Sequence, residues 1–222
     1  MSTKIELENV KPMDIEKRSF EIITEELAGM GKTLAPGTEP IVKRCIHTSA
    51  DFDYADNLYF SEGAVEKALA DLKSGAVIVT DTKMAWSGIN KNLLGRLGGE
   101  AFCFMSDTDV AAEAKSRGVT RAIVCMERGA KLQREGKKVI FAVGNAPTAL
   151  VRLYEMIENK EVDPSLIIGV PVGFVNVVPS KELIIESGVP CIVARGRKGG
   201  SNIAACICNA LMYMISTDRG YS

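Results

Sequence analysis

Short runs of consecutive apolar residues alternate along the chain with stretches in which apolar residues recur every three or four positions. The five short runs are Ala76–Asp81, Ala101–Met105, Lys138–Val143, Leu166–Val170 and Cys191–Arg195. Most of them end in, or are followed directly by, glycine or a polar residue, as parallel strands buried on both faces are. The intervening spacing is helical, so the sequence predicts strands that alternate with helices.

This alternation predicts a single α/β domain over residues 1–222, with a doubly wound, parallel, five-stranded sheet between helices in three layers. The expected helices are Pro12–Ala28, Ile41–Ser49, one beginning near Ser61, Val110–Arg117, Thr120–Arg134, Pro147–Asn159, Ser180–Ser187 and Ile203–Ile215. The last is apolar nearly all round and should be buried. Phe52–Phe60 is aromatic but irregular and gives no clear strand prediction. Sheets of this kind bind ligands at the carboxyl ends of their strands.

Composition narrows the functional classes. Hydrophobic residues make up 46% and charged residues 25% of the chain, and the net charge of −1 gives no overall field for nucleic acid or a membrane surface. The six cysteines lack CxxC spacing and most lie in apolar runs, so we expect neither a disulfide framework nor a metal site. No signal-peptide pattern or membrane-length apolar run is present, and we expect a cytoplasmic protein.

The clearest candidate for chemistry is His47, the only histidine in the chain. Histidine can exchange a proton near neutral pH. Arg44 lies three residues earlier and therefore shares its helix face, while Thr48, Ser49 and Asp51 follow at the end of the helix. Taken alone, a single histidine is more often structural or incidental than catalytic. The grouping predicts a general acid beside a fixed cation at one helix end.

The loops after the strands favour an anionic ligand over a nucleotide. No GxGxxG motif follows a strand, and Gly196–Ser201 lacks the spacing of a phosphate loop. The helix starts near Pro147 and Ser201 instead offer unpaired backbone N–H groups. Cations that could pair with carboxylates are Arg44, Arg121, Arg195, Arg197 and Lys198, although each could simply form a surface salt bridge. Together these features predict a ligand with several negative groups, acted on by one proton-transfer residue.

Four segments carry a resemblance to a known family: Arg44–Asp51, Gly144–Leu150, Gly169–Phe174 and Arg195–Ser201. The residues of these segments, and their order along the chain, resemble those of precorrin-8X methylmutases. The resemblance implies an isomerase that shifts a methyl group to a neighbouring carbon, converting precorrin-8X or cobalt-precorrin-8 into hydrogenobyrinate or cobyrinate in cobalamin biosynthesis. It also implies a flavodoxin-like topology, no cofactor, and a homodimer that binds a tetrapyrrole-derived polycarboxylate near the subunit interface.

By this resemblance His47 is the proton donor and acceptor. The positions expected to bind substrate are Ser19, Arg44, Arg121, Asn145, Thr148 and Ser201. Two alternatives stay open: a corrinoid-binding carrier that does no chemistry, and a nucleotide-dependent enzyme of flavodoxin-like topology. Both the metal-free and the cobalt-containing substrate also stay open, with the cobalt form slightly favoured.

Overall fold

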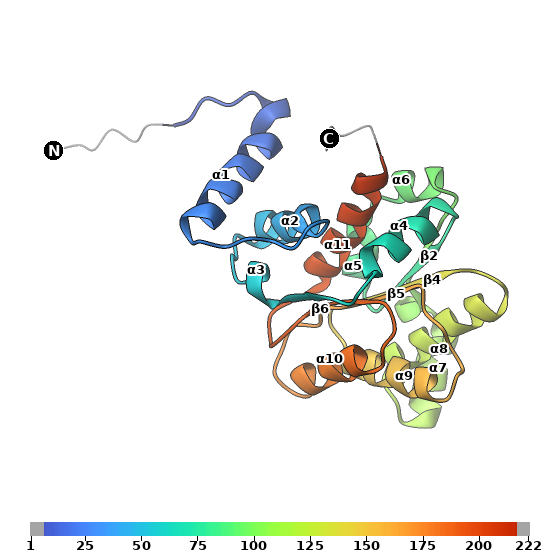
Figure 1. Ribbon diagram of the computed structural model, residues 1–222. Coiled ribbons are helices and arrows are strands. Elements are labelled where there is room, and N and C mark those ends of the chain that lie inside the picture. The colour runs from blue at the N-terminus through green and yellow to red at the C-terminus, as the bar shows by residue number, and fades with distance from the viewer. Residues whose placement is uncertain (1–6, 217–222) are drawn as a thin grey trace.

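The computed structural model describes residues 7–216 and is built on one six-stranded sheet, in the order β1-β6-β5-β4-β2-β3 (Figure 1). The strands are β1 Leu58–Phe60, β2 Val77–Thr80, β3 Ala101–Phe102, β4 Val139–Val143, β5 Leu166–Gly169 and β6 Cys191–Ala194. Strands β2, β4, β5 and β6 are buried along their whole length. Their continuous apolar runs therefore follow from burial on both faces.

The prediction of five strands, all parallel, needs correction. The five predicted strands are parallel, but β1 adds a sixth strand and pairs antiparallel with β6, so the sheet is mixed. β1 comes from the irregular aromatic stretch, and its three residues are only half-buried. An edge strand this short contacts the core too little to need a recognisable apolar pattern.

The second strand was also predicted too long. Ala101–Met105 forms only the two-residue β3, and a 3₁₀ turn, η2 (Phe104–Ser106), follows. β3 lies at the other edge and pairs with β2 alone. Side chains supply donors near it: Trp86 donates to the Ala101 carbonyl at 2.9 Å and Lys83 to the Cys103 carbonyl at 3.0 Å. These bonds satisfy carbonyls that a longer ladder would otherwise use.

Helices cover both faces of the sheet (Figure 1). On one face are α1 (Ile15–Gly29), α2 (Glu39–Ser49), α3 (Tyr54–Asn57), α4 (Ala64–Lys73), α5 (Lys83–Gly88), α6 (Lys91–Arg96) and α11 (Ser201–Ile215). On the other are α7 (Thr108–Arg117), α8 (Arg121–Arg134), α9 (Pro147–Glu158) and α10 (Val177–Glu186). A 3₁₀ turn, η1 (Pro12–Asp14), precedes α1. The three-layer arrangement expected from the alternating pattern is confirmed.

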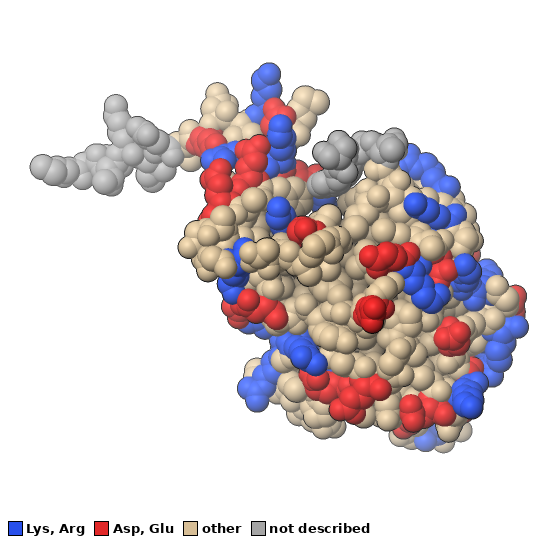
Figure 2. Space-filling view, in the orientation of Figure 1, with Lys and Arg blue, Asp and Glu red and all other residues tan. Residues whose placement is uncertain are grey.

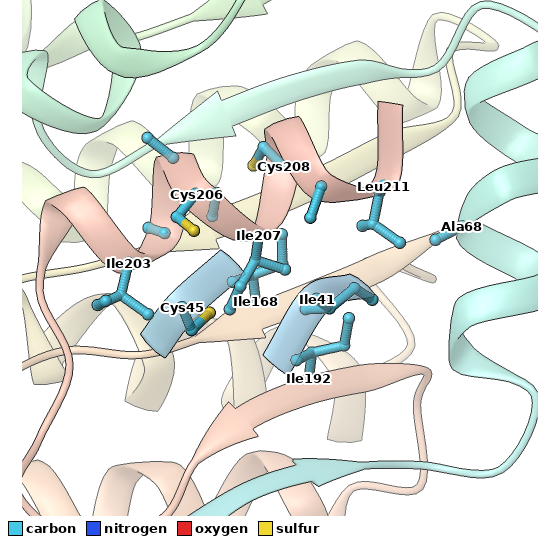
Figure 3. Close-up of a cluster of buried hydrophobic side chains, with 14 of the residues drawn as sticks. Ile41, Cys45, Ala68, Ile168, Ile192, Ile203, Cys206, Ile207, Cys208 and Leu211 are labelled. Carbon is cyan, nitrogen blue, oxygen red and sulfur yellow. The ribbon is translucent and has the colours of Figure 1, made fainter. Parts of the chain in front are cut away.

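Helix α11 is the centre of the first face. Its residues Ile203, Ile207 and Leu211 recur every four positions and are fully buried. Figure 3 shows them among side chains from α2, the sheet and α4. Burial of one such side chain stabilises the fold by roughly 1.5–3 kcal/mol. The prediction that this helix is buried is confirmed. Because α2 packs directly against α11, the position of α2 relative to the strand ends is fixed by this core.

Charged side chains of both signs are interspersed on the face shown in Figure 2, as the near-zero net charge leads one to expect. Between residues 7 and 216, no helix combines the length and the apolar character needed to cross a membrane.

Candidate active site

Helix α2 carries His47 in its last turn. Ile41, Val42, Cys45 and Ile46 form the buried face of α2, so the next position along the chain turns outward and the imidazole is exposed. The helix ends at Ser49, and the next residue, Ala50, has a left-handed φ of 54°. The predicted helix end near Ser49 is therefore confirmed. The packing of α2 on α11 thus presents the imidazole to solvent.

Helix α1 lies over α2 on the side of the imidazole. The Phe20 ring lies 5.4 Å from the His47 ring, centroid to centroid. Ser19 precedes that phenylalanine, is half-buried, and donates its hydroxyl to the Ile15 carbonyl at 2.9 Å. The structure therefore brings Ser19 and His47 to the same junction between two helices.

Arg44 is held at this junction by three groups. Its guanidinium forms a 2.7 Å salt bridge with Glu16 of α1, and its side chain is only 12% exposed. The same guanidinium lies 5.3 Å from the centroid of Phe20 and 4.8 Å from that of Tyr213. Within the chain, Arg44 joins α1, α2 and α11. Its predicted contact with substrate stays a prediction.

A hydrogen bond connects the end of α2 to α11. The Thr48 hydroxyl lies 3.3 Å from Sγ of Cys206, and the Cys206 and Cys45 thiols are also hydrogen-bonded (the two cysteines are labelled in Figure 3). Hydrogen bonds from Cys45 and Thr48 lower the pKa of Cys206. The hydrogen bond to Cys206, together with burial, raises the pKa of Cys45. The sequence alone predicts no role for either cysteine. Only the pairing of two helices distant in sequence reveals this polar contact.

A second group of predicted residues lies at the carboxyl ends of β2, β4 and β6. The Ser201 hydroxyl, at the start of α11, is 2.8 Å from that of Thr82, which follows β2. Gly144, after β4, contacts this serine so closely that a Cβ there would lie 2.6 Å from the Ser201 Cα. Glycine is thus required for α11 to begin at this edge. Asn145 follows and is exposed.

Asp81 organises the loop after β4. Its carboxylate is 1% exposed and accepts the N–H groups of Gly144, Asn145 and Ala146 at 2.9, 2.8 and 2.7 Å. Burial raises the pKa of Asp81, and the three donors oppose that shift. No substrate role had been assigned to Asp81 or Thr82, although the polar end of the first strand was visible in the sequence.

The remaining two predicted residues lie further along the same edge, on the other face of the sheet. The hydroxyl of Thr148, in the first turn of α9, is 2.9 Å from that of Thr120, the residue before α8. Arg121 begins α8, is exposed, and donates to the Met105 carbonyl at 3.5 Å. The side chains of Arg121 and Thr148 therefore lie by neighbouring helix starts.

The predicted residues thus form two groups, one at the junction of α1 and α2 and one at the carboxyl ends of the strands. Ser19, Arg44 and His47 lie where α1 meets α2, and Arg121, Asn145, Thr148 and Ser201 lie by the strand ends. Helix α11 links them, because it begins at Ser201 and contacts Thr48 through Cys206. Within residues 7–216, no hydrogen bond, ion pair or ring contact joins His47 directly to Arg121 or Thr148. A ligand that touched both groups would have to be broad.

Two clefts lie away from these groups. One of about 410 Å³ is lined by residues at the ends of α8 and α9 and beside the amino ends of β5 and β6, and another of about 260 Å³ lies along α8 and α9. They contain none of the predicted site residues.

Comparison with known proteins identifies the family. The family model described as precorrin-8X methylmutase matches residues 14–214. Cobalt-precorrin-8 methylmutase of Salmonella typhimurium is 45% identical over 206 residues, covering 91% of this chain and 95% of that protein. Precorrin-8X methylmutase of Pseudomonas aeruginosa is 39% identical, covering 89% and 93%. The solved structure of precorrin-8X methyl mutase from Thermus thermophilus superimposes with a TM-score of 0.80 at 36% identity, covering 91% of this chain and 97% of the other. The chain belongs to the precorrin-8X methylmutase family.

Proposed function

We propose that this protein shifts a methyl group to the neighbouring carbon of a corrin precursor, converting precorrin-8X or cobalt-precorrin-8 into hydrogenobyrinate or cobyrinate in cobalamin biosynthesis. The family match over residues 14–214 supports this activity. The observation that carries the mechanism is the exposed imidazole of His47 at the junction of α1 and α2, which α11 links to the hydrogen-bonding groups at the strand ends. A relative of the cobalt-precorrin-8 type is 45% identical, which favours the cobalt-containing substrate.

In this mechanism His47 supplies a proton to the macrocycle. Protonation makes the conjugated system electron-poor, so the methyl group migrates with its bonding electrons to the adjacent carbon. The proton then returns to the imidazole, and substrate and product have the same composition. The protein needs to provide neither a nucleophile nor a redox partner for this shift. Its other task is to hold the ring in one orientation.

Orientation falls to the polar groups along the edge. Ser19 and Arg44 would contact the ring near the imidazole, and Arg121, Asn145, Thr148 and Ser201 would contact carboxylates further along. The backbone N–H groups at the start of α9 and α11 add donors for the same carboxylates. Because the two groups are separate and α11 links them, a large flat ring fits the arrangement better than a compact ligand does.

We also propose a homodimer in the cytoplasm. The imidazole is exposed on the isolated protomer, and a second subunit placed over the α1–α2 junction would shield the reacting ring from water. Sedimentation equilibrium at several concentrations would test the dimer. The six cysteines in the described part of the chain are free and buried, which suits a reducing compartment. The five parallel strands, in the order β3-β2-β4-β5-β6, would then be the flavodoxin-like part of the sheet, with β1 added.

Replacing the imidazole tests the mechanism. His47→Ala should fold, bind cobyrinate and turn over at least about a hundredfold more slowly, since general acid catalysis contributes about 10²–10⁴ in rate. Absorbance spectroscopy with metal-free and cobalt-containing substrates measures turnover and identifies the preferred form. Near-normal turnover in the variant would reject the role of His47. Wild-type protein that bound cobyrinate without isomerising either substrate would instead be a corrinoid carrier.

A further inference from the structure

Two loops at the carboxyl ends of β5 and β6 form one unit. The N–H of Gly173 donates to the Arg197 carbonyl at 3.1 Å, and the N–H of Gly200 donates to the Val170 carbonyl at 2.8 Å. The two loops also touch at Gly199. Its φ is 154°, and a Cβ there would lie 2.1 Å from the Val170 carbonyl oxygen. The backbone of one loop therefore has a fixed position relative to that of the other.

Lys181 anchors this unit from inside the protein. The side chain comes from α10 and is fully buried. Its ammonium group donates to the carbonyls of Gly196 and Lys198 at 2.8 and 2.9 Å. These two carbonyls flank Arg197, whose own side chain is exposed. The backbone on each side of Arg197 is thus tied down, while its guanidinium points outward.

Arg197 differs from the cations beside it. The neighbours have carboxylate partners: Arg195 pairs with Glu182 at 3.3 Å, and Lys198 pairs with Asp51 and Asp53 at 2.7 and 2.6 Å. Arg197 has no carboxylate within 4.0 Å among residues 7–216, and its guanidinium lies 5.3 Å from the centroid of the Phe174 ring. The protein therefore leaves one cation in this loop uncompensated and places an aromatic ring beside it.

The aromatic ring belongs to an exposed apolar patch. Phe174 and Val175 are each 80% exposed and Val172 is 49% exposed. The patch adjoins the candidate active site, because Lys198, next to Arg197, is paired with Asp51, only four residues after His47. Clusters of exposed apolar side chains are typical of binding surfaces.

We propose that Arg197 and Phe174 form a binding contact for one carboxylate-bearing edge of the corrin ring. The apolar ring surface covers Phe174, and a peripheral carboxylate pairs with the Arg197 guanidinium in a bidentate hydrogen bond. An uncompensated cation beside an exposed aromatic face matches a ligand that is apolar in its plane and anionic at its rim. This assignment rests on the proposed function, since it concerns the same substrate.

The test separates the two halves of the contact. Wild type, Arg197→Gln and Phe174→Ala are titrated, by absorbance, with cobyrinate and with the same corrin after its peripheral carboxylates are converted to amides. Arg197→Gln should weaken cobyrinate binding roughly ten- to hundredfold, the effect of one charged hydrogen bond, and leave the neutral corrin unaffected. Phe174→Ala should weaken both ligands roughly tenfold. Arg134→Gln, in the cleft at the other edge, is the matched control and should change neither.

Unchanged cobyrinate binding in Arg197→Gln, or equal losses for both corrins, would overturn the contact. Light scattering on the same samples measures the oligomeric state. If Phe174→Ala changes that state but binds cobyrinate with wild-type affinity per subunit, the patch forms contacts between copies of this chain, and the proposal is overturned. Turnover is measured separately. If the wild-type protein turns over substrate but the variants bind cobyrinate as well as it does, only the contact is rejected. If the variants lose binding selectively but the wild-type protein shows no turnover, only the proposed reaction is rejected.

Discussion

Asp81→Ala removes the group that shapes the loop after β4. The carboxylate accepts three backbone N–H groups at 2.7–2.9 Å and is 1% exposed. A hydrogen bond to a charged group contributes about 1.5–3 kcal/mol, so three bonds give a gross loss of about 4–9 kcal/mol. Relief from burying the charge offsets several kcal/mol of this. We therefore expect the free energy of unfolding to fall by about 3–5 kcal/mol, which a domain stable by about 5–15 kcal/mol can tolerate.

The assay is urea unfolding followed by circular dichroism, together with cobyrinate titration under conditions where the variant is folded. Asp71→Ala is the matched control. This residue is 4% exposed, and its carboxylate pairs with Lys67 and Lys138, each at 2.6 Å, near the amino end of β2. Both variants should lose stability, but only Asp81→Ala should bind cobyrinate more weakly, because it alone releases Asn145 and the start of α9. A stability loss below about 1 kcal/mol, or equal loss of binding in the two variants, would refute this reasoning.

Two further predictions concern Lys181 and Gly144. Burial lowers the pKa of Lys181 to about 8, whereas in the unfolded chain the pKa returns to about 10.4. Between these two pKa values the unfolded chain binds more protons than the folded one, so stability should rise with pH. In urea unfolding, the free energy of unfolding of the wild type minus that of Lys181→Met should increase by up to about 3 kcal/mol from about pH 7.5 to 10.5. A difference that stays constant with pH would contradict this. Gly144→Ala would force β4 away from Ser201 and should cost about 1–3 kcal/mol, read as a lower melting temperature. Gly95→Ala, a helical site with nothing within 4 Å, should not lower it, and equal shifts would refute the close-contact argument.

The sequence predicted the central strands well because burial on both faces forces continuous apolar runs, as in Val139–Val143. It did not reveal β1, because an edge strand of three half-buried residues needs no such run. In the site, the exposed position of His47 follows from the buried face of α2, which local periodicity shows. The roles of Asp81 and Lys181 depend on partners 63–65 and 15–17 residues away. Such contacts are set by tertiary packing and leave no local signature.

The reversed direction of β1 has a consequence for where the histidine lies. In a parallel sheet, a helix that precedes a strand delivers the chain to that strand's amino end. Here Leu58, the first residue of β1, stands opposite Ala194, the last residue of β6, so the chain arrives from α2 and α3 at the side where all the other strands depart. If β1 ran parallel to its neighbours, the chain from α3 would enter it at the opposite end, about 10 Å (one length of β1) away. Three inverted residues thus allow a segment from the beginning of the chain to meet loops from its end.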